Sequence, residues 1–131
     1  MRLLLDTHIA VYFVTEPERI ARSAYELIMD SPGNAYVSAV SVWEIAIKHA
    51  LSPRRGAMPF SGRDAIRHFN DAGLELLDVT AEHAAAVADL PPIHADPFDR
   101  LLIAQAFTEP MRLITADRTV ARYSDMVILA G

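Results

Sequence analysis

The sequence predicts a three-layer α/β/α domain with a five-stranded parallel sheet, and three features of the chain support this fold class. Short apolar runs alternate with helical patterns along the chain, turn-forming residues separate them, and no repeat, linker or low-complexity tract interrupts the order. Strands joined by helices need right-handed crossovers, which produce a parallel sheet covered on both faces. The length of 131 residues suits a single domain spanning residues 1–131.

Each expected element follows from local sequence. Apolar runs closed by turn residues predict strands at 3–5, 35–38, 74–79, 112–115 and 126–129. Helical spacing and capping residues predict helices at 9–14, 17–28, 38 or 39 to 51, from 61 or 62 onward, 80–90, 97–107 and 116–123. The segment 93–99 is then a loop that leads into the helix beginning at Pro97.

Composition excludes several classes of protein. The chain is 52% hydrophobic and 22% charged, which is typical of a folded domain and not of a disordered chain. It has no cysteine, so oxygen or imidazole groups must hold any metal. The apolar run before Asp6 is too short for a signal peptide or a membrane span, so we expect a cytoplasmic protein without a membrane partner. The net charge of −5 disfavours nonspecific binding to nucleic acid.

Four carboxylates follow or interrupt apolar runs. Asp6 follows the first expected strand, and Asp117 follows the fourth after one residue. Ligands of parallel sheets bind at the carboxyl ends of the strands, so both side chains are expected there. Each also suits the N-cap of the next helix, and the pattern does not choose between a cap and a ligand.

The other two acids lie within expected helices. Glu44 is expected to face the interior with Val40, Trp43, Ile47 and Leu51, away from Ser41 and Lys48. A buried carboxylate requires a cation or several donors, so the alternatives are a metal and a salt bridge to an arginine.

Asp99 shares a helix side with Leu102, Ile103 and Ala106 and is also expected to face inward. Asp96 precedes Pro97 and is assigned to the N-cap.

The histidines give a weaker signal. His8 and His94 are expected in the loops nearest the acids, where a histidine-containing metal site is conceivable, although neither has ligand-like spacing. His49, His68 and His83 are expected on helices and in solvent. No serine or cysteine stands in a recognisable nucleophile pattern, and there is no glycine-rich phosphate loop. Hard oxygen ligands suit Mg²⁺ or Mn²⁺, and such ions act on phosphate esters.

Four stretches of the chain resemble the PIN-domain ribonucleases, specifically the VapC toxins of bacterial toxin-antitoxin pairs. They are LLDTH at 4–8, SAVSVWEI at 38–45, HADPFDRLLIAQA at 94–106 and LITAD at 113–117. The resemblance extends over essentially the whole chain, and the order and spacing of the motifs make it specific.

The resemblance implies a PIN-like fold, a homodimer, and metal-dependent endonucleolytic cleavage of RNA. It implies that Asp6, Asp99 and Asp117 hold one or two Mg²⁺ (or Mn²⁺) ions, with Glu44 completing or orienting the ligand shell. Thr7 and Thr115 would position water or phosphate. The expected partner is a VapB-type antitoxin, whose tail lies along the acidic groove with a basic side chain reaching the carboxylates.

Three further assignments are open at the level of sequence. Arg100 either braces the acids or is a surface charge, and Arg54 and Arg55 either contact RNA or lie in a solvated turn. Val42 and Ile45 are candidates for an exposed dimer surface.

Two rival classes of function remain. A strand ending in Asp-Thr also occurs in aspartyl-phosphate phosphatases and receiver domains, but the phosphatases need an aspartate where His8 stands, and receivers need a late lysine, whereas Lys48 is the only lysine. A noncatalytic module that binds an antitoxin or helps a complex bind DNA would function without its acids.

Overall fold

The structure, a computed structural model, describes residues 1–51 and 58–131. Arg54 and Arg55 lie outside these residues. In the described part of the chain a five-stranded parallel sheet has the order β3-β2-β1-β4-β5. The strands are β1 (Leu3–Leu5), β2 (Ala35–Ser38), β3 (Glu75–Leu77), β4 (Arg112–Thr115) and β5 (Ile128–Leu129). The expected fold class is therefore confirmed.

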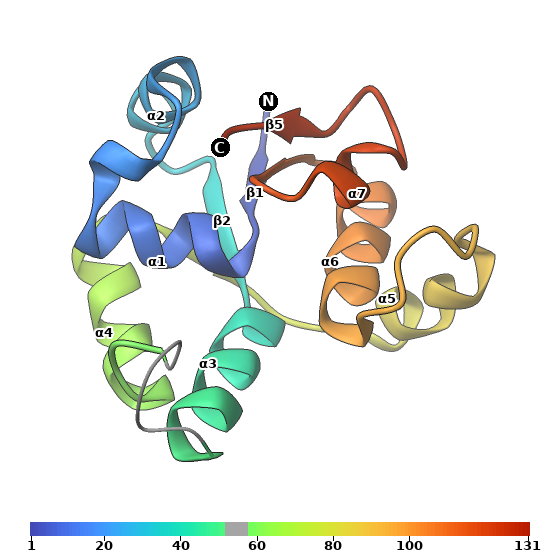
Figure 1. Ribbon diagram of the computed structural model, residues 1–131, viewed down its shortest axis with the longest axis horizontal. Coiled ribbons are helices and arrows are strands. Elements are labelled where there is room, and N and C mark those ends of the chain that lie inside the picture. Colours follow the sequence, from blue (N-terminus) through green and yellow to red (C-terminus); the bar gives the residue numbers. More distant parts are fainter. Residues whose placement is uncertain (52–57) are drawn as a thin grey trace.

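Helices cover both faces of this sheet (Figure 1). The α-helices are α1 (Thr7–Thr15), α2 (Arg22–Met29), α3 (Ala39–Leu51), α4 (Gly62–Asp71), α5 (Ala81–Ala86), α6 (Pro97–Thr108) and α7 (Arg118–Ala121). Two short 3-10 helices are η1 (Pro17–Arg19) and η2 (Val87–Asp89). Figure 1 shows α1, α2 and α4 on one side of the sheet and α5, α6 and α7 on the other.

The side chains of β1 point alternately to the two faces of the sheet, and each face has its own apolar cluster. Leu3 and Leu5 pack into a cluster with α1, α2 and α4, whereas Leu4 packs into a second cluster with α6 and α7. All three leucines are fully buried. Successive strand residues point to opposite faces, so a strand buried on both faces must be apolar throughout. This explains why the central strand is an uninterrupted leucine run that ends at the first polar residue, Asp6.

Two expected helices are interrupted. The expected helix 17–28 is split into η1 and α2 because Ile20 and Ala21 are extended, with ψ angles of 136° for both. The amide of Ala21 donates to the carbonyl of Ala130 at 2.7 Å, which is a long-range contact that helical periodicity does not reveal. The expected helix 80–90 similarly changes to a 3-10 helix at Val87.

The edge strands are shorter than expected. β3 covers three residues of the expected 74–79, and β5 covers two of the expected 126–129. Both lie at the ends of the strand order, where one neighbouring strand of the described sheet supplies hydrogen bonds. No helix among residues 1–51 and 58–131 is long and apolar enough to cross a membrane.

Candidate active site

The four sequence-predicted acids meet at the carboxyl edge of the sheet. Asp6 follows β1, Glu44 lies on α3, Asp99 lies in the first turn of α6, and Asp117 follows β4. They line a pocket of about 280 Å³. Its lining residues are Asp6, His8, Tyr12, Glu44, Lys48, Asp96, Asp99, Ala116 and Asp117. Because β1 and β4 are neighbouring parallel strands, the residues that follow them necessarily lie close together.

Asp6 is both a helix cap and a pocket residue. Its Oδ1 accepts the amide of Ile9 at 3.0 Å, which caps α1, and its Oδ2 accepts a short hydrogen bond from the hydroxyl of Thr115. The side chain is buried, and this burial raises the pKa of Asp6 above its ordinary value even though both hydrogen bonds act to lower it. Asp6 therefore is the helix cap that the sequence allowed, and it also lines the pocket.

Asp117 likewise combines a cap with a place in the pocket. Its Oδ1 accepts the amide of Thr119 at 2.8 Å and caps α7, and its Oδ2 lies 2.9 Å from His94 Nε2. Burial acts to raise the pKa of Asp117, but the hydrogen bonds from His94 and from the α7 amides outweigh it, so the pKa is lowered.

Glu44 is buried as expected, with 3% of its surface exposed, but its partners differ from the expectation. Its Oε1 accepts the hydroxyl of Thr7 at 2.7 Å, and its Oε2 accepts Lys48 Nζ at 2.6 Å. The sequence left open a metal or a salt bridge to an arginine, and the ion pair present is made with Lys48 and not with an arginine. Thr7 gives its only hydroxyl proton to Glu44, so Ser41 must donate in its 2.8 Å contact with Thr7.

The helical face assigned to Glu44 from sequence was wrong. Ser41 and Lys48 lie on its face at spacings of three and four residues, whereas Trp43 and Leu51 are 57% and 79% exposed. The buried face of α3 therefore contains a polar stripe at the pocket, which apolar spacing alone does not identify. Ile45 is fully buried, so the expectation that it lies on an exposed dimer surface is also wrong.

Asp99 is the least hydrogen-bonded of the four acids. Its Oδ2 lies 3.1 Å from His94 Nε2, and its side chain is 25% exposed to the pocket. Burial and the nearby charge of Asp96 raise its pKa to about 7, while His94 acts to lower it. Asp96 caps α6 as expected, accepting the amides of Phe98 and Asp99.

His94 lies beside the acids, where the sequence placed it as a conceivable metal ligand without ligand-like spacing. Its Nε2 lies between Asp99 and Asp117, so imidazole and carboxylate atoms that could ligate a metal fall within 4.8 Å of one another. Its Nδ1, however, accepts the amide of Asp96 at 3.0 Å. The proton of the neutral ring is therefore on Nε2, which donates to the acids and is not free to ligate a metal. His8, expected in a loop, is the second residue of α1 and is exposed.

Arg100 holds the loop that carries His94. Its guanidinium donates to the carbonyls of Val87 at 3.0 Å, Pro91 at 3.2 Å and His94 at 3.4 Å, and to the Tyr123 hydroxyl at 3.4 Å. The Tyr123 hydroxyl in turn accepts the amide of His94 at 2.7 Å. Arg100 therefore positions the loop and is neither a direct brace for the acids nor a free surface charge.

His83 also departs from the expectation of a solvated residue. It is 1% exposed, its Nε2 lies 2.6 Å from Glu109 Oε2, and its Nδ1 accepts the amide of Thr80 at 3.0 Å in a capping box. The hydrogen bond from His83 is the main reason that the pKa of Glu109 is lowered. This histidine joins α5 to the end of α6. Its hydrogen-bond partners do not line the acid pocket.

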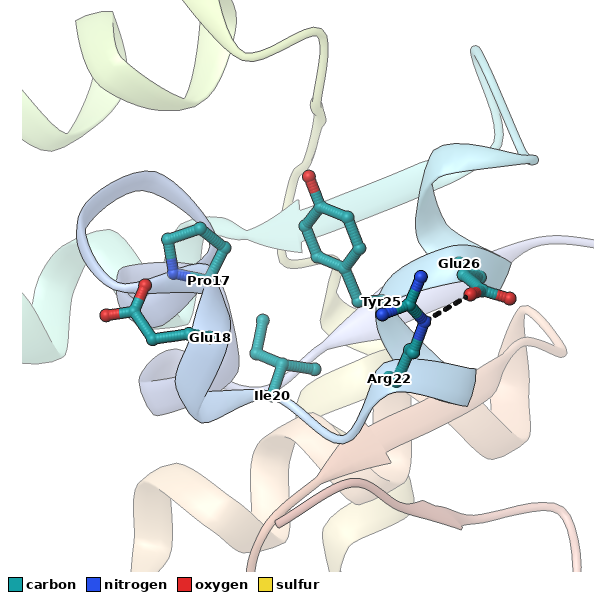
Figure 2. A pocket seen from close by; sticks show the side chains of 6 residues that line it. All are labelled: Pro17, Glu18, Ile20, Arg22, Tyr25 and Glu26. Carbon is teal, nitrogen blue, oxygen red and sulfur yellow. Dashed lines mark hydrogen bonds and ion pairs between the residues drawn. The ribbon is translucent and has the colours of Figure 1, made fainter.

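A larger hollow lies elsewhere, between η1 and α2, and has a volume of about 500 Å³ (Figure 2). Ile20 and Tyr25 line it, and the Arg22–Glu26 ion pair of 3.0 Å closes one side. Its two acids, Glu18 and Glu26, are exposed, and none of the four convergent acids lines it. The larger volume therefore does not identify the candidate active site. The convergence of buried acids in the smaller pocket does.

Comparison with known proteins agrees with the fold and identifies the family. Residues 3–126 match the PIN domain model. The chain is 31% identical over 119 residues to ribonuclease VapC22 of Mycobacterium tuberculosis (strain ATCC 25618 / H37Rv), and the match covers 88% of this chain and 87% of that protein.

Solved structures of toxin-antitoxin complexes share the fold. DNA-bound VapBC from Salmonella typhimurium has a TM-score of 0.68 at 14% identity, with 98% of this chain and 96% of that chain covered. VapBC2 from Rickettsia felis, bound to a promoter DNA fragment, has a TM-score of 0.67 at 18% identity and the same coverage. The chain therefore belongs to the PIN-domain family, and within it to the VapC-type ribonucleases.

Proposed function

We propose that this chain hydrolyses RNA phosphodiester bonds with Mg²⁺ or Mn²⁺ held by Asp6, Asp99 and Asp117, with Glu44 completing or orienting the ligand shell. The observation that carries the proposal is the charge of the pocket, whose lining includes five carboxylates and one ammonium group. Carboxylates gathered in this way repel one another, and the pKa of Asp99 is raised first by burial and then by that repulsion. A divalent cation relieves both effects.

The donor set fits a hard cation. The convergent acids offer carboxylate oxygens and the chain has no thiol, a combination that suits Mg²⁺ or Mn²⁺. Asp99 supports this assignment most strongly, because its second carboxylate oxygen has no hydrogen-bond partner among the described residues. When bound, such an ion neutralises phosphate charge and acidifies water for attack on phosphorus.

The residues around the acids hold them in place before any ion binds. Thr115 and the α1 amide fix Asp6, while Thr7 and Lys48 fix the two oxygens of Glu44. The sequence suggested that Thr7 and Thr115 position water or phosphate, but their hydroxyl protons go to carboxylates. Their proposed role is therefore to orient the acids. Groups held in advance lose little entropy on binding, which favours catalysis.

The proposed partners are a VapB-type antitoxin and a second copy of the chain. The solved relatives include VapBC complexes bound to DNA. A basic antitoxin side chain reaching the carboxylates would compete with the metal for the same negative charge. A peptide carrying that basic residue is therefore expected to inhibit RNA cleavage less as Mg²⁺ is increased.

The test is cleavage of total cellular RNA by protein freed of any antitoxin. We expect discrete fragments with Mg²⁺, none with excess EDTA, and none with Asp99→Asn. Asn has nearly the same shape as Asp but lacks its charge, so the comparison isolates the carboxylate. Cleavage that persists in Asp99→Asn would refute the assigned site. The absence of cleavage in every sample would instead support a noncatalytic binding module.

A further inference from the structure

Lys48 is the only lysine of the chain, and it lies in the acid pocket. It stands one helical turn after Glu44 on α3, so the two side chains share a face, and Nζ lies 2.6 Å from Glu44 Oε2. The Lys48 side chain is 40% exposed, whereas that of Glu44 is 4% exposed. The ammonium group therefore lies at the mouth of the pocket, and the carboxylate that it contacts lies behind it.

The ammonium has donors beyond those used by Glu44. A lysine carries three N–H donors, and Glu44 is its hydrogen-bond partner among residues 1–51 and 58–131. Of residues 1–51 and 58–131, Lys48 is the one lysine or arginine that lines the pocket, alongside five carboxylates. Within the described part of the chain, a phosphodiester entering the pocket is thus repelled by the acids and attracted by the ammonium group of Lys48.

We propose that Lys48 binds a nonbridging phosphate oxygen of the RNA at the cleavage site, with Glu44 as the residue that positions it. This inference rests on the proposed ribonuclease function and adds a substrate contact made by the protein itself. Lysine serves as a compact point charge for phosphate. The buried Glu44 fixes the position of that charge in the absence of RNA.

The alternative role is purely electrostatic, with Lys48 acting only as the counter-ion of Glu44. The two roles differ in a double-variant experiment. If Lys48 acts through Glu44 alone, Lys48→Gln has no further effect once Glu44 is already Gln. If Lys48 binds phosphate, its removal still weakens RNA binding in the Glu44→Gln background, but by less, because Glu44 no longer positions the ammonium group.

The measurement is the affinity of the Asp99→Asn protein for a fluorescent single-stranded RNA, by anisotropy in Mg²⁺ at several salt concentrations. We expect Lys48→Gln to weaken binding roughly fivefold and to reduce the slope of log affinity against log salt by about 0.7, the value for one phosphate contact. Lys48→Arg keeps the charge and is expected to retain most of the affinity. The matched control is Arg22→Gln, which removes a cation from an exposed i,i+4 pair outside the pocket.

Equal affinity and slope in Lys48→Gln and Arg22→Gln would overturn the proposal, as would an effect that vanishes in the Glu44→Gln background. Its failure is separable from that of the proposed function. RNA cleavage by the unmodified protein together with binding that does not depend on Lys48 refutes this inference alone. Binding that depends on Lys48 without cleavage refutes the ribonuclease proposal and leaves the phosphate contact standing.

Discussion

The hydroxyl of Thr115 connects the two aspartates that follow neighbouring strands. It donates to Asp6 Oδ2 and accepts the amide of Asp117 at 3.0 Å, and the threonine is fully buried. A buried hydrogen bond to a charged group contributes about 1.5–3 kcal/mol and is costly to remove. The orientation of both acids therefore depends on one side chain at the end of β4.

We predict that Thr115→Val lowers metal-dependent RNA cleavage at least tenfold. Valine preserves the shape of the side chain but leaves Asp6 without its hydroxyl donor, so the pKa of Asp6 rises further and its carboxylate is less available to a cation. The measurement is the cleavage rate at a fixed Mg²⁺ concentration. The control is Thr108→Val at the exposed end of α6. Equal rates in the two variants would contradict the assigned role.

The raised pKa of Asp99 makes the stability of the metal-free protein depend on pH. Between the ordinary value of 3.8 and the folded value of about 7, the folded protein retains a proton that the unfolded chain has released. The free energy of unfolding therefore falls as pH rises through this window, and the loss is complete above pH 7. Asn at position 99 does not ionise, so it removes the pH-dependent contribution of this residue to the free energy of unfolding.

In urea unfolding with EDTA, we therefore predict that Asp99→Asn is more stable than the unmodified protein at pH 8 by on the order of 2 kcal/mol. The difference should shrink towards pH 4, where Asp99 is protonated in the folded protein. A stability difference that does not change with pH would show that burial and neighbouring acids do not raise the pKa of the Asp99 carboxyl.

The sequence located all four acids because each interrupts an apolar pattern. Thr7, Thr115 and His94 were expected near the acids, but the contacts that they make were not predictable. Lys48 shares a helical face with Glu44, and His94 reaches Asp99 and Asp117 through the conformation of its loop, and apolar spacing reports neither. The role of Arg100 depends on backbone carbonyls of the loop before α6, which carry no sequence signal.

At the scale of elements, α3 and α4 approach closely at Gly62. A Cβ placed there would lie 2.8 Å from Ala46 Cβ and 3.3 Å from the Val42 carbonyl oxygen. Real Cβ atoms do not come so close, so the helices would have to separate. Because α3 carries Glu44 and Lys48, this contact also sets the position of one wall of the pocket.

Gly62→Ala is predicted to lower the free energy of unfolding by about 1–3 kcal/mol, the usual cost of overpacking. Urea denaturation measures the change. Adding Ala46→Gly relieves the clash, so the double variant should lose less stability than the sum of the two single changes. Strict additivity would contradict a direct contact between these positions.

Caps and central strands were predictable from sequence because their signals are local. Thr80 and Asp96 cap the expected helices, and β1, β2 and β4 have their expected bounds. The break at Ile20 and the short edge strands were not predictable. They depend on the Ala21–Ala130 hydrogen bond and on the final order of the strands.

At the scale of the whole molecule, Trp43 is a large exposed apolar side chain beside the site. It is 57% exposed and packs edge-to-face on Phe98, with ring centroids 5.0 Å apart, so that α3 and α6 share an aromatic surface. Exposed aromatic surface of this kind is characteristic of protein interfaces. We propose that it forms part of the homodimer contact.

Trp43→Glu is predicted to convert the proposed homodimer to a monomer, because a charge at a buried interface is strongly unfavourable. Light scattering after size-exclusion chromatography gives the mass. Phe107→Glu, at an exposed position on the same helix as Phe98, is expected to remain dimeric. A dimer that survives Trp43→Glu would place the interface elsewhere.

We propose that the pocket binds a divalent metal through Asp99 and not through the neighbouring cap, Asp96. The decisive measurement is titration of metal-free protein with Mn²⁺, followed by electron paramagnetic resonance. Asp96→Asn keeps an efficient helix cap and should bind Mn²⁺ nearly as the unmodified protein does, whereas Asp99→Asn should bind at least tenfold more weakly. Equal binding by the two variants, or no saturable binding by the unmodified protein, would contradict the account.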